Sequence, residues 1–206
     1  MEPEQPAPIK PRIVNIKLLG PIGAGKKSLV FRFSQNAFKR EGVPTFQIDF
    51  MFKMINKDGK KYNLKFFRPK DENEKGSKEY LKATKIIMYI FDISNEENVK
   101  EFKENISKAF ENAEKNALKY VIGNKIDLED KRVIKFDEAK EIVEKLGFQY
   151  REVSALNGDK CNDVVNEALD EFIKKFPLKE KKKTEEKKRR KIKNRFFKFK
   201  NLLFLI

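Results

Sequence analysis

The chain has 206 residues, a length that suits one domain of ordinary size with a tail. Its single cysteine, Cys161, excludes a disulfide framework, and the lack of histidine removes the commonest metal ligand and the usual general base. The net charge of +15 is uneven, because residues 179–206 carry 13 of the 47 Lys and Arg residues and only three acidic residues. This excess predicts an anionic partner surface, either a membrane or a nucleic acid.

The predicted elements begin after an acidic, proline-rich stretch at residues 1–10, which lacks the charged start and apolar run of a secretory signal. No apolar run is long enough to span a bilayer as a helix. The single cysteine fits a reducing, intracellular setting. Asp58 and Gly59, between two alternating segments, are a strong hairpin signal. The predicted elements, in chain order, are a strand at 12–19, a helix at 29–38, strands at 46–55, 62–67 and 86–91, a helix near 98–112, a strand at 120–122, a helix at 137–146, a strand at 148–153 and a helix at 164–176.

This alternation of strands and helices predicts an α/β fold. We expect a mostly parallel six-stranded sheet with one antiparallel strand, helices on both faces and a ligand at the carboxyl ends of the strands. Pro177 closes the last predicted helix, and the charge run starts two residues later. The folded domain is therefore expected at residues 11–178, between a flexible N-terminus at 1–10 and a basic tail at 179–206.

Residues 20–28 read Gly-Pro-Ile-Gly-Ala-Gly-Lys-Lys-Ser, a phosphate-binding loop except that Lys27 stands where Ser or Thr is expected. In such a loop, glycines let backbone N–H groups converge on the phosphates, the lysine reaches the outer phosphates, and the hydroxyl ligates Mg²⁺. The phosphate cradle is thus kept and the metal ligand is lost. The predicted phosphate-binding residues are Gly20, Gly23, Ala24, Gly25, Lys26, Lys27 and Ser28.

Two further motifs, Asn124-Lys125-Ile126-Asp127 and Val153-Ser154-Ala155-Leu156, each follow a predicted strand. Each motif is weak alone, but three in this order and spacing are a strong signal. With them the chain resembles the Ras superfamily of small GTPases, most closely its Rab and Ras branches, over about residues 10–178. The resemblance implies a P-loop NTPase fold of the small G domain type.

The base-binding chemistry explains the residue types in these two motifs. An aspartate carboxylate can accept hydrogen bonds from guanine N1 and N2, which adenine does not offer, so Asp127 predicts selection of guanine. The resemblance implies that Asn124 and Lys125 support this loop and that the N–H of Ala155 donates to guanine O6. The predicted guanine-binding residues are Phe38, Asn124, Lys125, Asp127, Ser154, Ala155 and Leu156.

Phe38 and Thr45 are assigned to the nucleotide site by the resemblance. Phe38 lies seven residues before Thr45, which matches the family's aromatic that stacks on guanine; the alternative is a phenylalanine of the core. Residues 44–50 resemble the first switch, with Thr45 at the position that responds to the γ-phosphate through Mg²⁺. The alternative for Thr45 is an ordinary loop threonine before a strand.

The chain departs from the family at the motif Asp-Thr-Ala-Gly-Gln after the third strand, which holds the metal's water shell and orients the attacking water. A gapless alignment through the hairpin places residues 68–72, Arg-Pro-Lys-Asp-Glu, there. An alignment backward from Asp92 places residues 66–70 there instead, and both lose the Asp, the Gly and the Gln. We therefore expect weak or lost GTP hydrolysis, with Lys70 and Glu72 as weak catalytic candidates.

Lys27 and Arg68 put two cations where Mg²⁺ would sit, because they replace the hydroxyl and the carboxylate ligands. Two unit charges about 4 Å apart repel by about 4 kcal/mol at an effective dielectric constant of 20. We expect GTP or GDP to bind with Mg²⁺ weak or absent, since both cations suit phosphates. The alternative is that Lys27 turns to solvent, Arg68 forms a surface salt bridge and Ser28 ligates the metal, although a shift by one residue turns a helical side chain about 100°.

The tail lacks the prenylated cysteine of the family. Ile192, Phe196, Phe199, Leu203 and Ile206 would share one face of a helix, so residues 187–206 predict a basic amphipathic helix on an anionic membrane. The alternatives are a nuclear-import signal at residues 187–191, a disordered tail or a segment that binds a partner's groove. We expect a cytoplasmic protein with peripheral membrane association and no DNA partner.

The leading hypothesis is a guanine-nucleotide-binding protein with impaired GTP hydrolysis. The resemblance implies a role in membrane traffic or signalling, in which the switch surface contacts effector proteins. Two alternatives remain: a pseudo-GTPase scaffold that binds no nucleotide, and a conventional slow GTPase.

Overall fold

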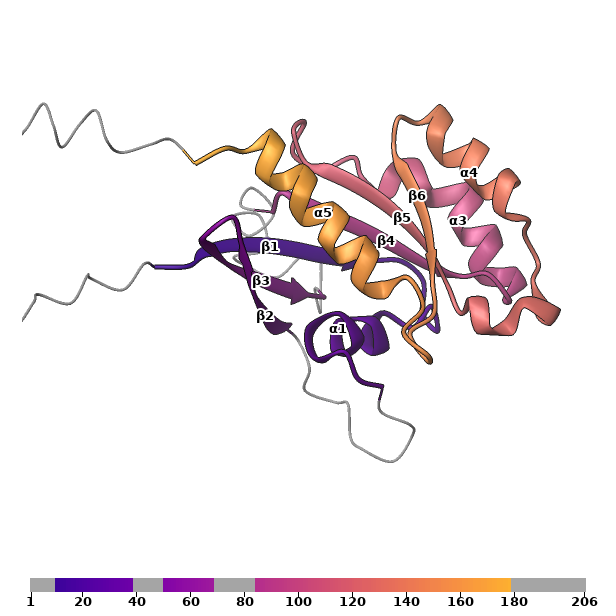
Figure 1. Cartoon of the computed structure of the whole chain (residues 1–206). Coiled ribbons are helices and arrows are strands. Elements are labelled where there is room, and N and C mark those ends of the chain that lie inside the picture. Colours follow the sequence, from indigo (N-terminus) through magenta and orange to yellow (C-terminus); the bar gives the residue numbers. More distant parts are fainter. Residues whose placement is uncertain (1–9, 39–49, 69–83, 179–206) are drawn as a thin grey trace, which may run out of the picture. The chain divides into compact units, whose positions relative to one another are not determined.

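The computed structural model of the chain describes residues 10–38, 50–68 and 84–178 (Figure 1). These residues form six strands, four α-helices and one 3₁₀-helix, in the alternating order that the sequence predicts. The elements are β1 (Arg12–Leu19), α1 (Lys26–Gln35), β2 (Phe50–Lys57), β3 (Lys60–Phe67), β4 (Ile86–Asp92), α3 (Glu96–Ala109), β5 (Leu118–Asn124), the 3₁₀-helix η1 (Ile126–Lys131), α4 (Phe136–Lys145), β6 (Gln149–Val153) and α5 (Cys161–Lys175).

The six strands form one sheet in the order β2-β3-β1-β4-β5-β6. Strands β1, β3, β4, β5 and β6 are parallel, and β2 alone runs antiparallel to its neighbour β3. Asp58 and Gly59 join β2 to β3 with φ angles of 51° and 70°, the left-handed conformation that a two-residue hairpin turn requires. The predicted fold class and the predicted hairpin are both confirmed.

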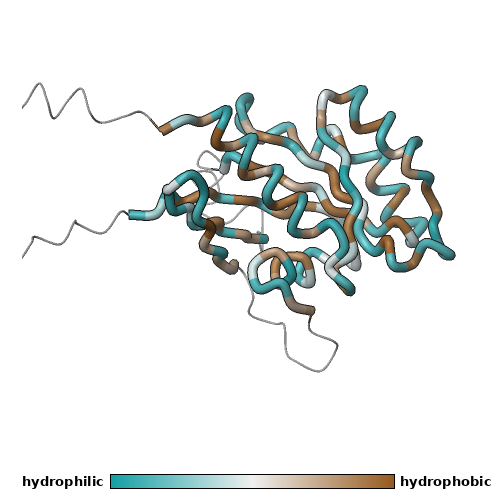
Figure 2. Tube along the Cα trace, in the orientation of Figure 1, coloured by the Kyte–Doolittle hydropathy of each residue, from teal (hydrophilic) through white to brown (hydrophobic). Residues whose placement is uncertain are grey.

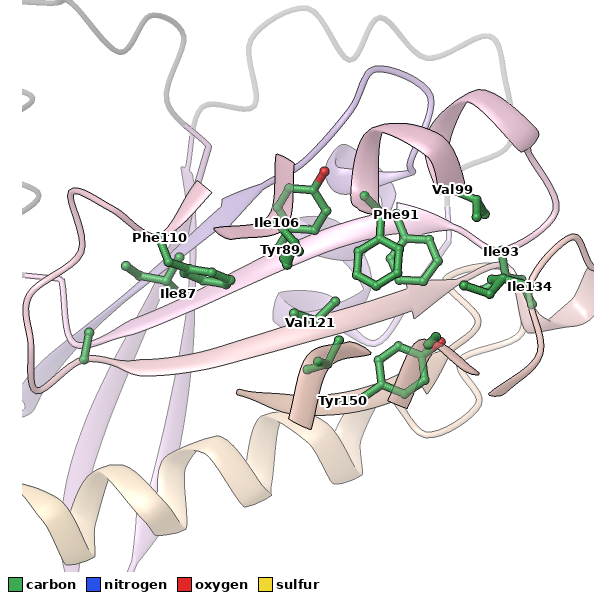
Figure 3. Packing of buried hydrophobic residues seen from close by; sticks show 14 residues of the cluster. Ile87, Tyr89, Phe91, Ile93, Val99, Ile106, Phe110, Val121, Ile134 and Tyr150 are labelled. Atoms are coloured by element: carbon green, nitrogen blue, oxygen red, sulfur yellow. The ribbon is translucent and has the colours of Figure 1, made fainter. Parts of the chain in front are cut away.

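Helices cover both faces of the sheet, because alternate residues of each buried strand point to opposite faces. On one face, Phe91 of β4 stacks on Phe102 of α3, with 4.4 Å between the ring centroids. These two rings belong to a buried cluster built from β4, β5, β6, α3 and α4 (Figure 3). On the other face, Phe33 of α1 packs against Phe66 of β3. In Figure 2 the helices alternate between hydrophilic and hydrophobic residues, as helices with one buried face do.

Helix α1 differs from its predicted bounds by three residues at each end. It begins at Lys26, directly after Gly25, whose φ of 87° turns the phosphate loop into the helix without an intervening strand or linker. It ends at Gln35 because Asn36, with a φ of 51°, adopts the left-handed conformation that terminates helices. Phe38 therefore lies beyond the helix instead of within its last turn.

Several predictions fall on residues outside the described ranges: the N-terminal stretch up to residue 9, Thr45, Lys70, Glu72 and the tail at 179–206. The chain divides into two units, Met1–Phe172 and Ile173–Ile206, and the second is described only as far as Leu178. The domain boundary near residue 178 stays a prediction. None of the helices in the described residues has the length and apolar character needed to cross a membrane.

Candidate nucleotide-binding site

The three predicted motifs lie together because each follows a parallel strand. The phosphate loop follows β1, residues 124–127 follow β5, and residues 154–156 follow β6. Parallel strands place their carboxyl ends at one edge of the sheet, which is the edge where α/β proteins bind ligands. The order of the strands thus brings together segments that are separated by more than 100 residues in the chain.

Two glycines of the phosphate loop lie where no side chain fits. Gly20 has a φ of 122°, and a Cβ there would lie 1.9 Å from the carbonyl oxygen of Ile90. Gly25 has a φ of 87°, and its Cβ would lie 2.3 Å from Nδ2 of Asn124. The backbone of this loop therefore packs directly against β4 and β5, as a loop that wraps phosphates must.

Lys26, the first residue of α1, lies over the phosphate loop. Its Nζ donates to the carbonyl oxygen of Gly20 at 2.6 Å and to that of Pro21. Burial and the neighbouring charge of Arg68 lower the pKa of Lys26 to about 8, although Glu101 acts in the opposite direction. The N-terminus of α1 also presents backbone N–H groups and the positive end of the helix dipole, so the site favours an anion.

Asn124 connects the phosphate loop to residues 154–156, which are the predicted base-binding loop, called the base loop below. Its side chain is almost fully buried, its Nδ2 donates to the carbonyl of Ala24 at 2.9 Å, and its Oδ1 accepts from the N–H of Ala155 at 3.1 Å. Guanine O6 can therefore receive this N–H only if Ala155 shares it with Asn124 or releases Asn124. The predicted donation from Ala155 to guanine stays a prediction, with this competing partner now identified.

Ser154 fixes the carboxylate that is predicted to select the base. The buried hydroxyl of Ser154 donates to Oδ1 of Asp127, and the Ser154 carbonyl accepts from Sγ of Cys161 at 3.3 Å. Asp127 itself is half-buried, so a ligand can reach its carboxylate. Leu156, the last residue of the motif, is exposed.

Lys125 has a left-handed backbone with a φ of 70°, and its Nζ pairs with Oδ2 of Asp92 at 2.6 Å. Asp92 ends β4 and is 5% exposed, and its other oxygen accepts from the N–H and the hydroxyl of Ser94. In addition, Nδ2 of Asn98 donates to the carbonyl of Ile22 in the phosphate loop at 3.2 Å. Sequence reasoning did not assign Asp92 or Asn98 to the site, although Asp92 ends an apolar run at the same edge of the sheet.

The two unusual cations lie beside the phosphate loop. Lys27 and Ser28 are the second and third residues of α1, and both are half-buried. Arg68 directly follows β3, where the parallel register pairs Phe67 with Lys17 of β1. Among the described residues, the buried Nε of Arg68 has no hydrogen-bond partner. Arg68 thus lies at the same edge of the sheet as the phosphate loop, and its charge acts on Lys26.

Lys27 and Arg68 bring no metal ligand to this edge of the sheet. Mg²⁺ requires oxygen ligands, and the described part of the chain contains no cluster of three or more Cys, Asp or Glu side chains that could hold a metal ion. Lysine and arginine have no lone pair to offer a metal while they are charged. Phosphate oxygens, in contrast, are good partners for both.

Comparison with known proteins agrees with this geometry. The family model described as Ras family matches residues 15–174. The chain belongs to the Ras family. GTP-binding protein ypt2 of Schizosaccharomyces pombe is 28% identical over 159 residues, which are 76% of this chain and 78% of the relative. Ras-related protein Rab-8B of Homo sapiens is 30% identical over 145 residues, which are 69% of this chain and 70% of the relative.

Membership of this family implies a small GTPase fold that binds a nucleotide. Arg32 also belongs to this candidate site, although the sequence alone did not predict it. Arg32 of α1 is buried, and its guanidinium donates to the carbonyls of Ala155 and Leu156. A signal was present, because Arg32 lies three residues after the buried Leu29 and one before the buried Phe33, on the inner side of the helix.

Proposed function

We propose that this protein binds GTP and GDP with little dependence on Mg²⁺ and hydrolyses GTP weakly or not at all. The observation that carries the proposal is that Arg68, at the end of β3, and Lys27, in the first turn of α1, lie at the same edge of the sheet as the phosphate loop. By resemblance to the family, Lys27 and Arg68 occupy the positions whose side chains contact the metal in other members. Cations there supply the positive charge that Mg²⁺ would otherwise bring to the phosphates.

The electrostatics of the site without nucleotide support an anionic ligand. Burial and Arg68 both disfavour the charged form of Lys26, which is why its pKa falls to about 8. A bound phosphate reverses the effect, because its negative charge stabilises Lys26 and Arg68 together. The chain would hold the phosphates with the backbone of residues 20–25, Lys26 and the two added cations.

The base would be held by the other half of the site. Asp127, oriented by Ser154, would accept from guanine, and Asn124 would keep this half in place against the phosphate loop. Phe38 is half-buried just beyond α1, and its stacking on the base belongs to this proposal. The nucleotide fits these residues, whereas Mg²⁺ does not.

Weak hydrolysis follows from the residues that replace the family's water-orienting motif. In both alignments, the segment after β3 has neither the glutamine nor the glycine. Catalysis of phosphoryl transfer depends on positioning the water and on stabilising the developing charge. Cations alone supply only the charge stabilisation. Lys70 and Glu72 remain weak candidates for positioning the water.

The decisive experiment measures the affinities of the purified full chain for GDP and GTP, once with Mg²⁺ and once with a chelator. We expect the two conditions to agree within about threefold. A loss of affinity of more than about a hundredfold on chelation would show a conventional metal site and contradict the proposal. Single-turnover hydrolysis with Mg²⁺ then tests the conventional slow GTPase, which would release phosphate within the assay.

A scaffold that binds no nucleotide is the alternative from a different class. Cationic residues at the two positions that contact the metal in the family, Lys27 and Arg68, are also consistent with a protein that no longer exchanges nucleotides. Release and identification of any nucleotide carried by the purified protein separates the two. A chain that carries none and takes up no labelled GTP would be a scaffold.

A role in membrane traffic or signalling also belongs to the proposal, and family membership supports it. The outer face of β2, an edge strand, exposes Phe50, Phe52 and Met54 by 51%, 43% and 55%, as a surface for effector proteins would. The basic residues 187–206 would attach the protein to the cytoplasmic face of an anionic membrane. Sedimentation with vesicles, with and without anionic lipid, tests this part, and equal binding to neutral vesicles would contradict it.

A further inference from the structure

Arg32 is a buried cation whose described partners are all backbone carbonyls. It lies in the second turn of α1 and is 9% exposed. Its Nε donates to the carbonyl of Ala155 at 2.9 Å, its Nη2 to that of Leu156 at 2.6 Å, and its Nη1 to that of Asn36 at 3.1 Å. Within the described residues, no carboxylate contacts this guanidinium.

These three carbonyls belong to the two sides of the predicted guanine pocket. Ala155 and Leu156 form the base-binding loop, and Asn36 ends α1 two residues before Phe38. A guanidinium is planar and rigid, so its donors fix the relative positions of the oxygens that accept from them. Hydrogen bonds from a charged donor are also stronger than neutral ones, and removal of the guanidinium would take this donor from the buried carbonyl of Ala155.

The surroundings of Arg32 fit this role. Gly158, with a φ of 93°, leaves room for the guanidinium, because a Cβ there would lie 3.3 Å from Nη1. The Asn36 side is held as well, since Nδ2 of Asn162 donates to Oδ1 of Asn36 at 3.3 Å. Nζ of Lys53 in turn donates to Oδ1 of Asn162 at 3.0 Å. Arg32 is thus the centre of a polar network that joins α1, β2 and α5 to the base loop.

We propose that Arg32 is a positioning residue that sets the distance between the end of α1 and residues 154–156, and thereby the selectivity of the site at the six-position of the purine. This inference rests on the proposed binding of guanine nucleotides. The N–H groups of the base loop can recognise an oxygen at the six-position of the purine only while the loop is held at a fixed distance from the base. If the position of the loop varies, the site also accommodates a larger atom that is a weaker hydrogen-bond acceptor.

The test compares GDP with 6-thio-GDP, in which sulfur replaces O6 while N1–H and the N2 amino group are kept. Sulfur is a larger atom and a weaker acceptor, so we expect the full chain to prefer GDP by about fivefold or more, the value of one neutral hydrogen bond. In Arg32→Met, which keeps the apolar stem, the preference should fall below about twofold. Affinity for GDP itself should fall about tenfold or more.

Arg151→Met is the matched control. Arg151 lies on β6 beside the same loop, but its guanidinium pairs with the carboxylate of Glu167 instead of with loop carbonyls. This variant should keep the full preference for GDP over 6-thio-GDP. Arg32→Lys, which can restore one of the three donations, should recover part of the preference and serves as the milder variant if Arg32→Met does not fold.

The outcomes separate the two proposals. A wild-type chain that binds neither GDP nor 6-thio-GDP overturns the proposed function and, with it, this inference. A wild-type chain that prefers GDP, with an unchanged preference in both Arg32 variants, overturns this inference alone. Amide hydrogen exchange adds a readout without nucleotide: residues 155–157 should exchange faster in the Arg32 variants than in Arg151→Met, and equal rates contradict the positioning role.

Discussion

Asn124 donates a hydrogen bond to the carbonyl of Ala24 at 2.9 Å, across 100 positions of the sequence. The same side chain accepts from the N–H of Ala155, so one buried amide joins the phosphate loop to the base loop. The two halves of the nucleotide site are therefore mechanically coupled before any nucleotide is bound. A change at Asn124 should affect recognition of the phosphates and of the base together.

Asn124→Ala removes both hydrogen bonds and leaves a buried carbonyl and a buried N–H unpaired. Each such group costs about 1–3 kcal/mol, so we expect the free energy of unfolding to fall by about 2–6 kcal/mol and GDP affinity by more than about tenfold. Urea denaturation and nucleotide titration measure the two effects. Asn162→Ala, which removes a more exposed amide, is the control, and an equal loss in both variants would contradict the special position of Asn124.

The lowered pKa of Lys26 predicts how stability depends on pH. Without nucleotide, the folded chain loses this proton near pH 8, whereas the unfolded chain keeps it up to about pH 10.5. The unfolded state then binds more protons, so the contribution of Lys26 to the free energy of unfolding rises with pH in this window. Urea denaturation across the window should show a steeper rise in wild type than in Lys26→Met. Equal slopes would show that Lys26 is not perturbed.

Nucleotide binding should reverse this perturbation of Lys26. Phosphates favour the charged amine, so binding above about pH 8 should take up a proton. Titration calorimetry of GDP in buffers with different ionisation enthalpies measures this uptake directly. We expect it to be absent in Lys26→Met, and a wild-type chain without uptake would contradict a direct contact between Lys26 and the phosphates.

Restoring the family's metal ligands should restore dependence on Mg²⁺. In the double variant Lys27→Ser with Arg68→Asp, a hydroxyl and a carboxylate replace the two cations. We expect GDP to bind at least about tenfold more tightly with Mg²⁺ than with a chelator, because oxygen ligands suit this ion. Lys60→Ser with Lys61→Asp, at the exposed end of the hairpin, lowers the net charge by the same amount and is the charge control. A double variant that stays indifferent to Mg²⁺ would show that these positions do not face the metal.

A buried ion pair stabilises the region between the two base-binding segments. Arg132, after η1, donates to both oxygens of Glu152 on β6 at 2.8 and 2.9 Å, and the hydroxyl of Tyr150 donates to the same carboxylate. Glu152→Gln leaves the half-buried Arg132 with only its exposed partner Glu129, so we expect a loss of about 2 kcal/mol in the free energy of unfolding. Glu129→Gln removes the exposed partner of the same arginine and should change stability little.

Most of the fold could be predicted from local pattern. The apolar runs of β1, β4 and β5 and the turn at Asp58 and Gly59 carry their own signals, because strand burial and hairpin geometry depend on adjacent residues. The bounds of α1 could not be predicted in this way. They depend on the left-handed backbone of Gly25 and Asn36, and apolar spacing carries no information about either.

In the candidate nucleotide site too, some features could be predicted from the sequence and others depend on the tertiary structure. The sequence by itself determined the residue types, from the glycines of the loop to Asp127, because their chemistry and spacing are properties of short segments. Tertiary structure alone decided which groups meet: Asn124 with Ala24, Lys125 with Asp92, and Arg32 with the base loop. The physical reason is that these contacts join the ends of different parallel strands to one another or to α1, and only the order of strands in the sheet makes them neighbours. In the same way, the parallel pairing of β3 with β1 brings Arg68 to the edge of the sheet where Lys27 lies in the first turn of α1.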